Sequence, residues 1–202
     1  MMVREMASGG RTRTRRLLFL ATVALCSVAN GTGIGTTTVP DAAPQVSVHE
    51  SRGLYTVTAR FRVAQPVSAA LAVLTDYERI PRFMPDVKTS IVRHRSAGHV
   101  LVEQEAVSGI MLFSKRIYLL LDVHEDSDGV RFRDASGRSF SHYEGAWRLS
   151  QHDGQTVICY ELSARPSFSV PEFLLARLFR KDAKQMIERL RTEIASRQPL
   201  PS

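Results

Sequence analysis

The stretch SVPEFLLARLFRKDAKQMIERLRTEIASR, residues 169–197, decides the fold of this chain. Its apolar residues recur three and four positions apart, which places them on one stripe of an α-helix: Phe173, Leu174, Leu175, Leu178, Phe179, Ala183, Met186, Ile187, Leu190 and Ile194. Ser169, with Glu172 three residues later, predicts a capping box, and Pro171 suits the first helical turn. The pattern therefore predicts one long helix, which needs an apolar surface to pack against.

The sequence before this helix predicts a sheet that supplies the surface. The first strand is expected within residues 46–63, where residues 55–63 alternate apolar and polar side chains, as a strand with one wet face does. Short helices are expected at residues 67–74 and 77–83. Six further strands with short turns are expected at residues 87–94, 99–108, 112–124, 130–135, 140–150 and 156–164.

These elements predict an α+β fold. A curved antiparallel sheet of six to seven strands bends around the long C-terminal helix, in the order strand, two helices, six strands, helix. A twisted sheet and a straight helix cannot touch everywhere, so an elongated apolar cavity is expected between them, as in many ligand sites.

The first 29 residues have the pattern of an export signal. Five arginines precede an apolar run at residues 17–28, and Ser27 and Ala29 fit signal-peptidase cleavage after Ala29. The run is short for a transmembrane helix. An uncleaved anchor and a misplaced start codon remain alternatives, and the Sec and twin-arginine routes both remain open. We expect a periplasmic or secreted protein with a flexible leader at residues 30–45 and a binding domain at residues 46–198.

Charge and cysteine content narrow the function classes. Residues 1–29 hold five arginines and one glutamate, so their removal lowers the formal net charge from +7 to +3. A nucleic-acid partner is therefore not expected. Cys26 leaves with the signal, which leaves Cys159 as the single thiol, so no intramolecular disulfide is expected. Transient contact with a membrane stays open, and the sequence gives no oligomeric state.

Several short motifs carry a family resemblance. Residues 64–66 (AQP) and 73–85 (VLTDYERIPRFMP) are followed by residues 145–149 (GAWRL), 154–157 (GQTV) and 160–162 (YEL). Together they resemble the START-like helix-grip superfamily, also called SRPBCC, in its polyketide cyclase/dehydrase and coenzyme Q-binding branch. The resemblance covers residues 48–194. Leu71 departs from it, because many relatives carry an aromatic residue there.

The resemblance implies a helix-grip fold with a cavity for an apolar ligand, and it does not imply one reaction. Members of the superfamily bind lipids, sterols or quinones, cyclise polyketides, or act on ribosomes, so fold alone does not settle function. We expect no cofactor other than an isoprenoid quinone or lipid held as ligand.

Candidate catalytic residues are few, and an enzyme is the less favoured reading. His142 shares a strand face with Glu144 and Arg148, while Tyr143 and Trp147 occupy the opposite, apolar face. The apolar face is expected to point into the cavity, which would place His142 outside it. His142, Tyr143 and Tyr160 are therefore only weak catalytic candidates. No His, Cys, Asp or Glu residues have the sequence spacing of a metal site, so none is expected.

Aromatic and methionine side chains are the stronger candidates for ligand binding. Those at the ends of elements suggest a gate for the cavity: Phe83, Met84, Met111, Phe113 and Phe168. Those on the expected inner faces suggest a lining: Tyr118, Phe132, Trp147, Tyr160, Phe173, Leu174 and Leu178. Arg177, near the helix stripe, would meet a polar head group. Ordinary packing is the alternative for each of these residues.

Three functions follow in order of preference. The first is an exported protein that carries or sequesters an apolar molecule. The second is a polyketide cyclase/dehydratase-type enzyme that uses the same cavity. The third is an interaction protein like the ribosome-associated relatives, which the export signal disfavours.

Overall fold

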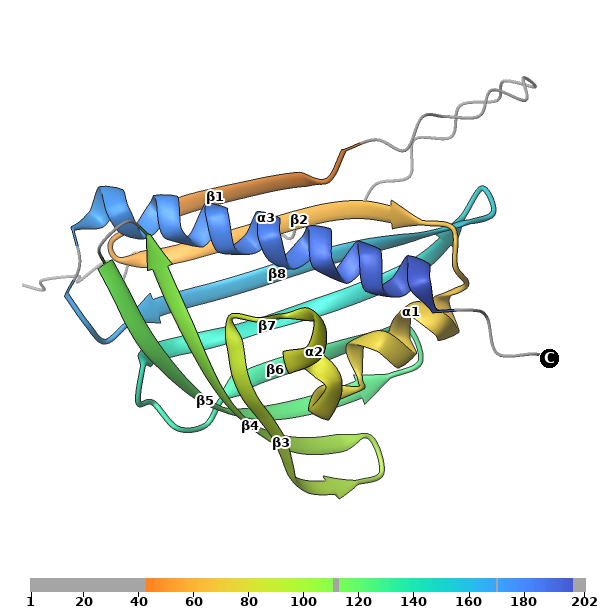
Figure 1. Cartoon of the computed structure of the whole chain (residues 1–202), viewed down its shortest axis with the longest axis horizontal. Helices are drawn as coiled ribbons and strands as arrows, with labels where there is room; N and C mark the ends of the chain where they lie inside the picture. The colour runs from red at the N-terminus through yellow and green to blue at the C-terminus, as the bar shows by residue number, and fades with distance from the viewer. Residues whose placement is uncertain (1–42, 111–112, 170, 198–202) are drawn as a thin grey trace, which may run out of the picture. The chain divides into compact units, whose positions relative to one another are not determined.

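Eight antiparallel strands form a curved sheet, and the C-terminal helix lies across one of its faces (Figure 1). The computed structural model describes residues 43–110, 113–169 and 171–197, all within one compact unit, Val39–Ser202. The strands are β1 (Gln45–Ser51), β2 (Leu54–Val63), β3 (Val87–Ser96), β4 (His99–Ile110), β5 (Phe113–Asp126), β6 (Gly129–Asp134), β7 (Phe140–His152) and β8 (Gln155–Pro166). The expected export signal, and the leader up to residue 42, lie outside the described residues.

The helical elements follow the expected order. α1 (Val67–Leu74), the 3-10 turn η1 (Tyr77–Arg79) and α2 (Ile80–Phe83) connect β2 to β3, and α3 (Glu172–Ser196) follows β8. The sheet order is β1-β2-β8-β7-β6-β5-β4-β3, so the last strand pairs with the second. The expected α+β helix-grip architecture is confirmed, with more strands than predicted.

The additional strand comes from a hairpin at the start of the domain. β1 pairs with β2 in register from Gln45 opposite Arg60 to Ser51 opposite Leu54. Arg52 and Gly53 form the turn, with φ of 51° and 76°. Positive φ at both central residues characterises the tight hairpin turn that usually takes Asn-Gly or Asp-Gly. Arg-Gly is a weaker signal for such a turn, so the sequence pattern did not predict this hairpin.

The start of α3 differs from the predicted capping box. Pro171 is the N-cap, with φ −51° and ψ 130°, and no side chain caps the helix there. The Pro171 carbonyl instead accepts hydrogen bonds from the Leu174 and Leu175 amides at 2.9 and 3.2 Å. The predicted cap at Ser169 is therefore wrong, because the proline already holds the extended backbone that an N-cap requires.

The core forms where the apolar stripe of α3 packs on the sheet. Ile187 and Ile194 are fully buried, and Leu190 is 2% exposed. Near the other end of the helix, the Phe179 ring stacks on Tyr55 of β2 at a centroid distance of 4.9 Å. The helix is thus packed against the sheet near both of its ends.

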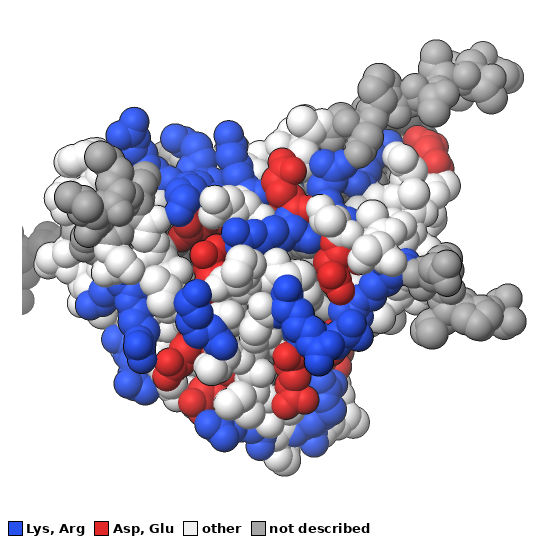
Figure 2. Space-filling model, viewed as in Figure 1, with Lys and Arg blue, Asp and Glu red and all other residues white. Residues whose placement is uncertain are grey.

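The two outer strands, β1 and β3, differ in regularity. β1 follows β2 without a shift in register. β3 pairs with β4 through two register shifts, between Val87 and Thr89 and between Val92 and His94. On the face shown in Figure 2, basic and acidic side chains are intermixed. Within the described part of the chain, no helix is long and apolar enough to span a membrane.

Candidate functional site: an apolar cavity under the C-terminal helix

A cavity of about 330 Å³ lies between the sheet and α3. Side chains from β2 to β8, from α1, η1, α2 and α3, and from the loops before β3 and α3 line it. Its volume is at the lower end of the range for small-molecule sites. The expected cavity is therefore present, and most of its lining is apolar.

Seven of the predicted binding residues line the cavity. They are Phe83, Met84, Phe132, Trp147, Tyr160, Phe168 and Leu178. The Phe132 ring fits against the sheet because residue 145 is glycine: a Cβ atom there would lie 2.6 Å from the ring's Cζ atom. The backbone of β7 thus makes room for an aromatic group of the lining.

Four of the other predicted residues lie outside the lining. The Tyr118 ring packs under the Arg138 guanidinium, whose Cζ atom lies 3.8 Å from the centroid of the ring. Phe173 is 66% exposed, Arg177 is exposed and Leu174 is half-buried. Helical spacing alone grouped Phe173 and Leu174 with Leu178, although the cavity borders α3 only from Leu175 onward. Met111 and the Phe113 side chain lie outside the described parts of the structure.

The predicted faces of β7 are confirmed. Tyr143 and Trp147 line the cavity. The His142 imidazole lies on the other face, with Nε2 3.1 Å from the Ser163 hydroxyl and 3.6 Å from the Glu144 carboxylate. His142 therefore has no access to a ligand in this cavity, while Tyr143 and Tyr160 do.

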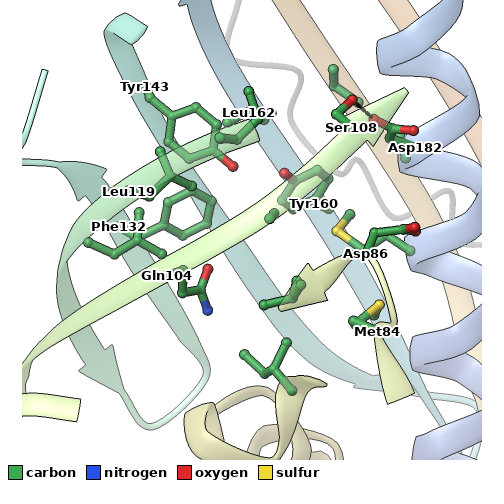
Figure 3. Close-up of a pocket in the computed structure, with 18 of the residues that line it drawn as sticks. Met84, Asp86, Gln104, Ser108, Leu119, Phe132, Tyr143, Tyr160, Leu162 and Asp182 are labelled. Carbon is green, nitrogen blue, oxygen red and sulfur yellow. Dashed lines mark hydrogen bonds between the residues drawn. The ribbon is translucent and has the colours of Figure 1, made fainter. Parts of the chain in front are cut away.

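A group of polar residues that was not predicted from the sequence lies at one side of the cavity, here called the mouth: Asp86, Ser108, Asp182 and Arg189. The Ser108 hydroxyl donates to Asp182 Oδ2 at 2.5 Å (Figure 3). Arg189 pairs with Asp86 at 2.6 Å. The side chains of Asp86, Arg189 and Asp182 are 57, 31 and 39% exposed, so the cavity reaches the surface here.

Both bonds join α3 to a facing segment. Ser108 belongs to β4, and Asp86 precedes β3. A third contact, from Lys181 Nζ to the Gly109 carbonyl at 2.7 Å, does the same. The sequence carried a signal for Asp182, because it falls between Phe179 and Met186 on the apolar stripe of the helix. A carboxylate in an apolar stripe indicates a polar contact across the interface.

Burial raises the pKa of Asp182, although the Ser108 hydroxyl and Lys181 partly counteract this effect. The folded state therefore binds the Asp182 proton more tightly than the unfolded chain. That contribution to stability is present at low pH and is lost as the pH rises above 3.8 through the raised pKa.

We expect Asp182→Asn to remove this loss, because asparagine still accepts from Ser108 but does not ionise. Relative to wild type, the variant should gain stability between acidic and neutral pH, by less than about 1 kcal/mol for a partly solvated group. Urea unfolding across that range measures the difference. Asp153→Asn, at an exposed turn, is the control and should keep the pH dependence of wild type. Parallel profiles of unfolding free energy against pH for wild type and Asp182→Asn would contradict the expectation.

A family profile described as polyketide cyclase / dehydrase and lipid transport matches residues 63–191. The chain belongs to this family. The matched residues run from the end of β2 almost to the end of α3, so they contain nearly all of the cavity lining. The START-like resemblance seen in the sequence is confirmed. No curated protein sequence matches the chain significantly.

Solved structures from several organisms share the fold of this polyketide cyclase/dehydrase and lipid transport family member. A protein from Thermus thermophilus is 19% identical, with a TM-score of 0.60, over 70% of this chain and 99% of its own. A STAR-related lipid transfer protein from Xanthomonas axonopodis is 15% identical, with a TM-score of 0.57. The match covers 76% of this chain and 99% of the Xanthomonas chain. The Zhui aromatase/cyclase from a Streptomyces species is 13% identical, with a TM-score of 0.60. The match covers 70% of this chain and 93% of the Zhui chain.

The structure also brings together a group of possible metal ligands outside the cavity. His99 and His124 face each other across β4 and β5, and Asp122 lies beside them. Sequence spacing did not reveal the group, because strand pairing creates it. The Asp122 carboxylate already contacts the His99 imidazole and pairs with Arg133 at 2.7 Å, and both contacts lower its pKa. His99 and Arg133 therefore already give the Asp122 carboxylate partners, so its position does not itself indicate a bound metal ion.

Proposed function

We propose that this protein binds an apolar small molecule, such as a lipid or an isoprenoid quinone, between the sheet and α3, and carries or sequesters it. The observation that carries the proposal is the cavity of about 330 Å³, with a mainly apolar lining and charged groups only at the mouth. Burial of apolar surface supplies the affinity in such a site. Membership of a family described by lipid transport, and the fold shared with a STAR-related lipid transfer protein, support it.

We also propose that the protein acts outside the cytoplasm. The support is the arginine-rich start, the apolar run at residues 17–28 and the cleavage pattern ending at Ala29. Expression of the full chain in a bacterial host, followed by fractionation and N-terminal sequencing, tests this. A processed chain beginning at residue 30 outside the cytoplasm is expected, and a full-length cytoplasmic chain would contradict it.

Native mass spectrometry tests the binding proposal most directly. The chain from residue 30 onward, which includes the whole compact unit, would be purified from a bacterial host without detergent. We expect an adduct of a few hundred daltons, the size that a cavity of about 330 Å³ holds, which solvent extraction would release for identification. A well-folded protein that stays empty even after incubation with host lipid extract would count against a carrier.

An enzyme of the cyclase type is the second candidate, and one observation favours it. Tyr143 and Tyr160 place hydroxyl groups inside the cavity, where a polyketide chain would lie. His142 is on the other face, so this candidate depends on the two tyrosines. Turnover of polyketide-like substrates that is unchanged in the Tyr143→Phe and Tyr160→Phe proteins would remove them as catalytic residues.

A further inference from the structure

Two tyrosines of the cavity have hydroxyl groups without a hydrogen-bond partner among the described residues. Tyr143 on β7 and Tyr160 on β8 both line the cavity, and Tyr160 is only 4% exposed. No hydrogen bond joins either hydroxyl to another residue in the described parts of the chain. Tyr77, a third lining tyrosine, differs, because its hydroxyl donates to Glu125 Oε1 at 2.9 Å. Among the described residues, the only fully buried side-chain polar atom without a partner is Arg197 Nη2, so both tyrosine hydroxyls border the open space of the cavity. They are therefore free to hydrogen-bond a ligand group that enters it.

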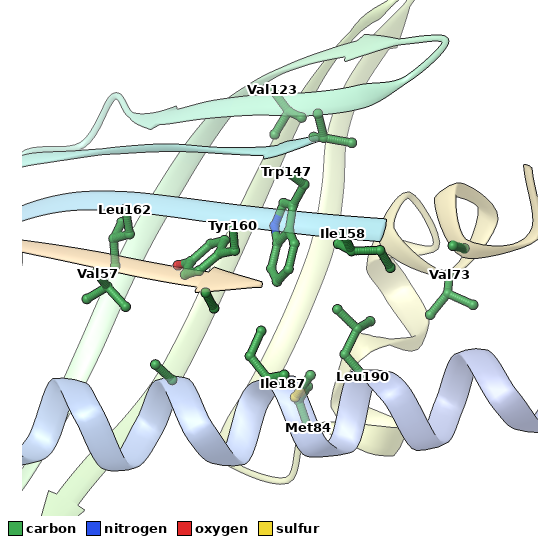
Figure 4. Packing of buried hydrophobic residues seen from close by; sticks show 14 of the residues in the cluster. Val57, Val73, Met84, Val123, Trp147, Ile158, Tyr160, Leu162, Ile187 and Leu190 are labelled. Carbon is green, nitrogen blue, oxygen red and sulfur yellow. The ribbon is translucent and has the colours of Figure 1, made fainter. Parts of the chain in front are cut away.

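Aromatic neighbours hold both rings in place. The Tyr160 ring packs on Trp147 at a centroid distance of 4.2 Å (Figure 4). The Tyr143 ring packs against Phe140 at 4.8 Å and Phe132 at 6.0 Å. The two hydroxyls turn toward each other in Figure 3, although the rings come from different strands. The hydroxyls are thus positioned before any ligand arrives, which lowers the entropic cost of binding.

Both phenols remain protonated under physiological conditions. Burial raises the pKa of Tyr143 to about 12, and it raises the pKa of Tyr160 well above 10, with a further contribution from Tyr143. A neutral phenol donates one hydrogen bond and can also accept. The pair therefore offers two donors to an oxygen atom placed between or beside them.

The one cation among the described lining residues, Arg189, lies on α3, and the charged group that acts on Tyr143 is the Asp134 carboxylate. The charged residues of the described lining are Asp86, Asp182 and Arg189, on α3 or just before β3, and none lies on β7 or β8. A carboxylate beside the tyrosines would be removed from water without a cation, which is costly. A carbonyl oxygen needs only hydrogen bonds, and the phenols supply them.

We propose that Tyr143 and Tyr160 form a recognition site for an uncharged oxygen acceptor, above all a carbonyl group, on an otherwise apolar ligand. The site depends on the proposed function and narrows its ligand class. Neutral carbonyl-bearing molecules are favoured over pure hydrocarbons of the same shape, and over fatty acids held with the carboxylate inward.

Fluorenone and fluorene, two rigid molecules that differ by one carbonyl oxygen, provide the test. Titration of wild type, Tyr143→Phe and Tyr160→Phe proteins with each probe gives a ratio of affinities for each protein. Each hydrogen bond lost should lower the preference for fluorenone by about fivefold, while the fluorene affinity stays the same or rises. The infrared carbonyl stretch of bound fluorenone should lie at lower frequency in wild type than in either variant, which a purely structural role would not produce.

Three controls make the outcomes distinct. Tyr118→Phe, outside the lining, should leave the fluorenone preference unchanged. The ligand-free Tyr160→Phe protein should be at least as thermally stable as wild type, since no group in the described part of the chain loses a hydrogen-bond partner. Leu178→Trp, which fills the cavity, should prevent both probes from binding.

If both probes bind and Leu178→Trp excludes them, but the phenylalanine variants change neither the preference nor the carbonyl frequency, the recognition site is wrong and the proposed function stands. If neither probe binds wild type, or Leu178→Trp has no effect on binding, the proposed function fails together with the recognition site.

Discussion

A Leu178→Trp protein is expected to fold normally and to bind apolar ligands at least about tenfold more weakly than wild type. Leu178 is 6% exposed and lines the cavity from α3. The indole ring would occupy much of a space of about 330 Å³ and displace the ligand. Tenfold corresponds to about 1.4 kcal/mol, which is less than burial of two ligand methylene groups contributes.

The fluorescence of Nile red, a neutral apolar dye, measures this uptake, and circular dichroism checks the fold. Arg180→Trp adds the same side chain to an exposed position of α3 and should leave uptake unchanged. Ala106→Phe fills the cavity from β4 and should repeat the loss. Undiminished uptake by folded Leu178→Trp and Ala106→Phe proteins would place the ligand elsewhere.

Ile187→Ala is expected to cause the largest loss of stability, about 2–5 kcal/mol in the free energy of unfolding. Ile187 is fully buried and projects from α3 toward Trp147 and Tyr160 (Figure 4). Truncation removes apolar contacts at the point that fixes the helix to the sheet. The loss is large against a typical total of about 5–15 kcal/mol.

Urea unfolding measures this change, and Phe173→Ala is the matched control on the same helix. Phe173 is 66% exposed, so its truncation should change the free energy of unfolding by no more than about 0.5 kcal/mol. Equal effects of the two substitutions would show that α3 is not fixed to the sheet through its apolar stripe.

Local pattern was sufficient for most of the fold. The stripe of α3, the alternation in β2 and the Asp-Gly turn at Asp153 and Gly154 each specify their element through neighbouring residues. The failures came where local signals were ambiguous. Arg52 and Gly53 form a tight turn with an uncommon residue pair, and Pro171 takes the N-cap position that the capping-box pattern assigns to Ser169.

The site was harder to predict than the fold. Alternation correctly separated the faces of β7, but it does not reveal which inward residues border empty space. That depends on the curvature of the sheet and the position of α3, so Phe173 and Leu178 looked equivalent in sequence. The mouth arises from contacts between distant segments, such as Ser108 with Asp182, and no sequence spacing encodes them.

The irregular edge of the sheet has a consequence for solubility. An outer strand offers its backbone groups to any other chain that can pair with it, and long, straight edges promote aggregation. β3 is shifted in register at two points, and its exposed side chains include Lys88, Arg93 and Arg95. A second chain would meet interrupted pairing along this strand, and it would have to compete with the ion pairs of Arg93 with Glu103 and of Arg95 with Glu125. A protein with an apolar cavity beneath its helix thus has an edge strand that resists forming intermolecular sheets.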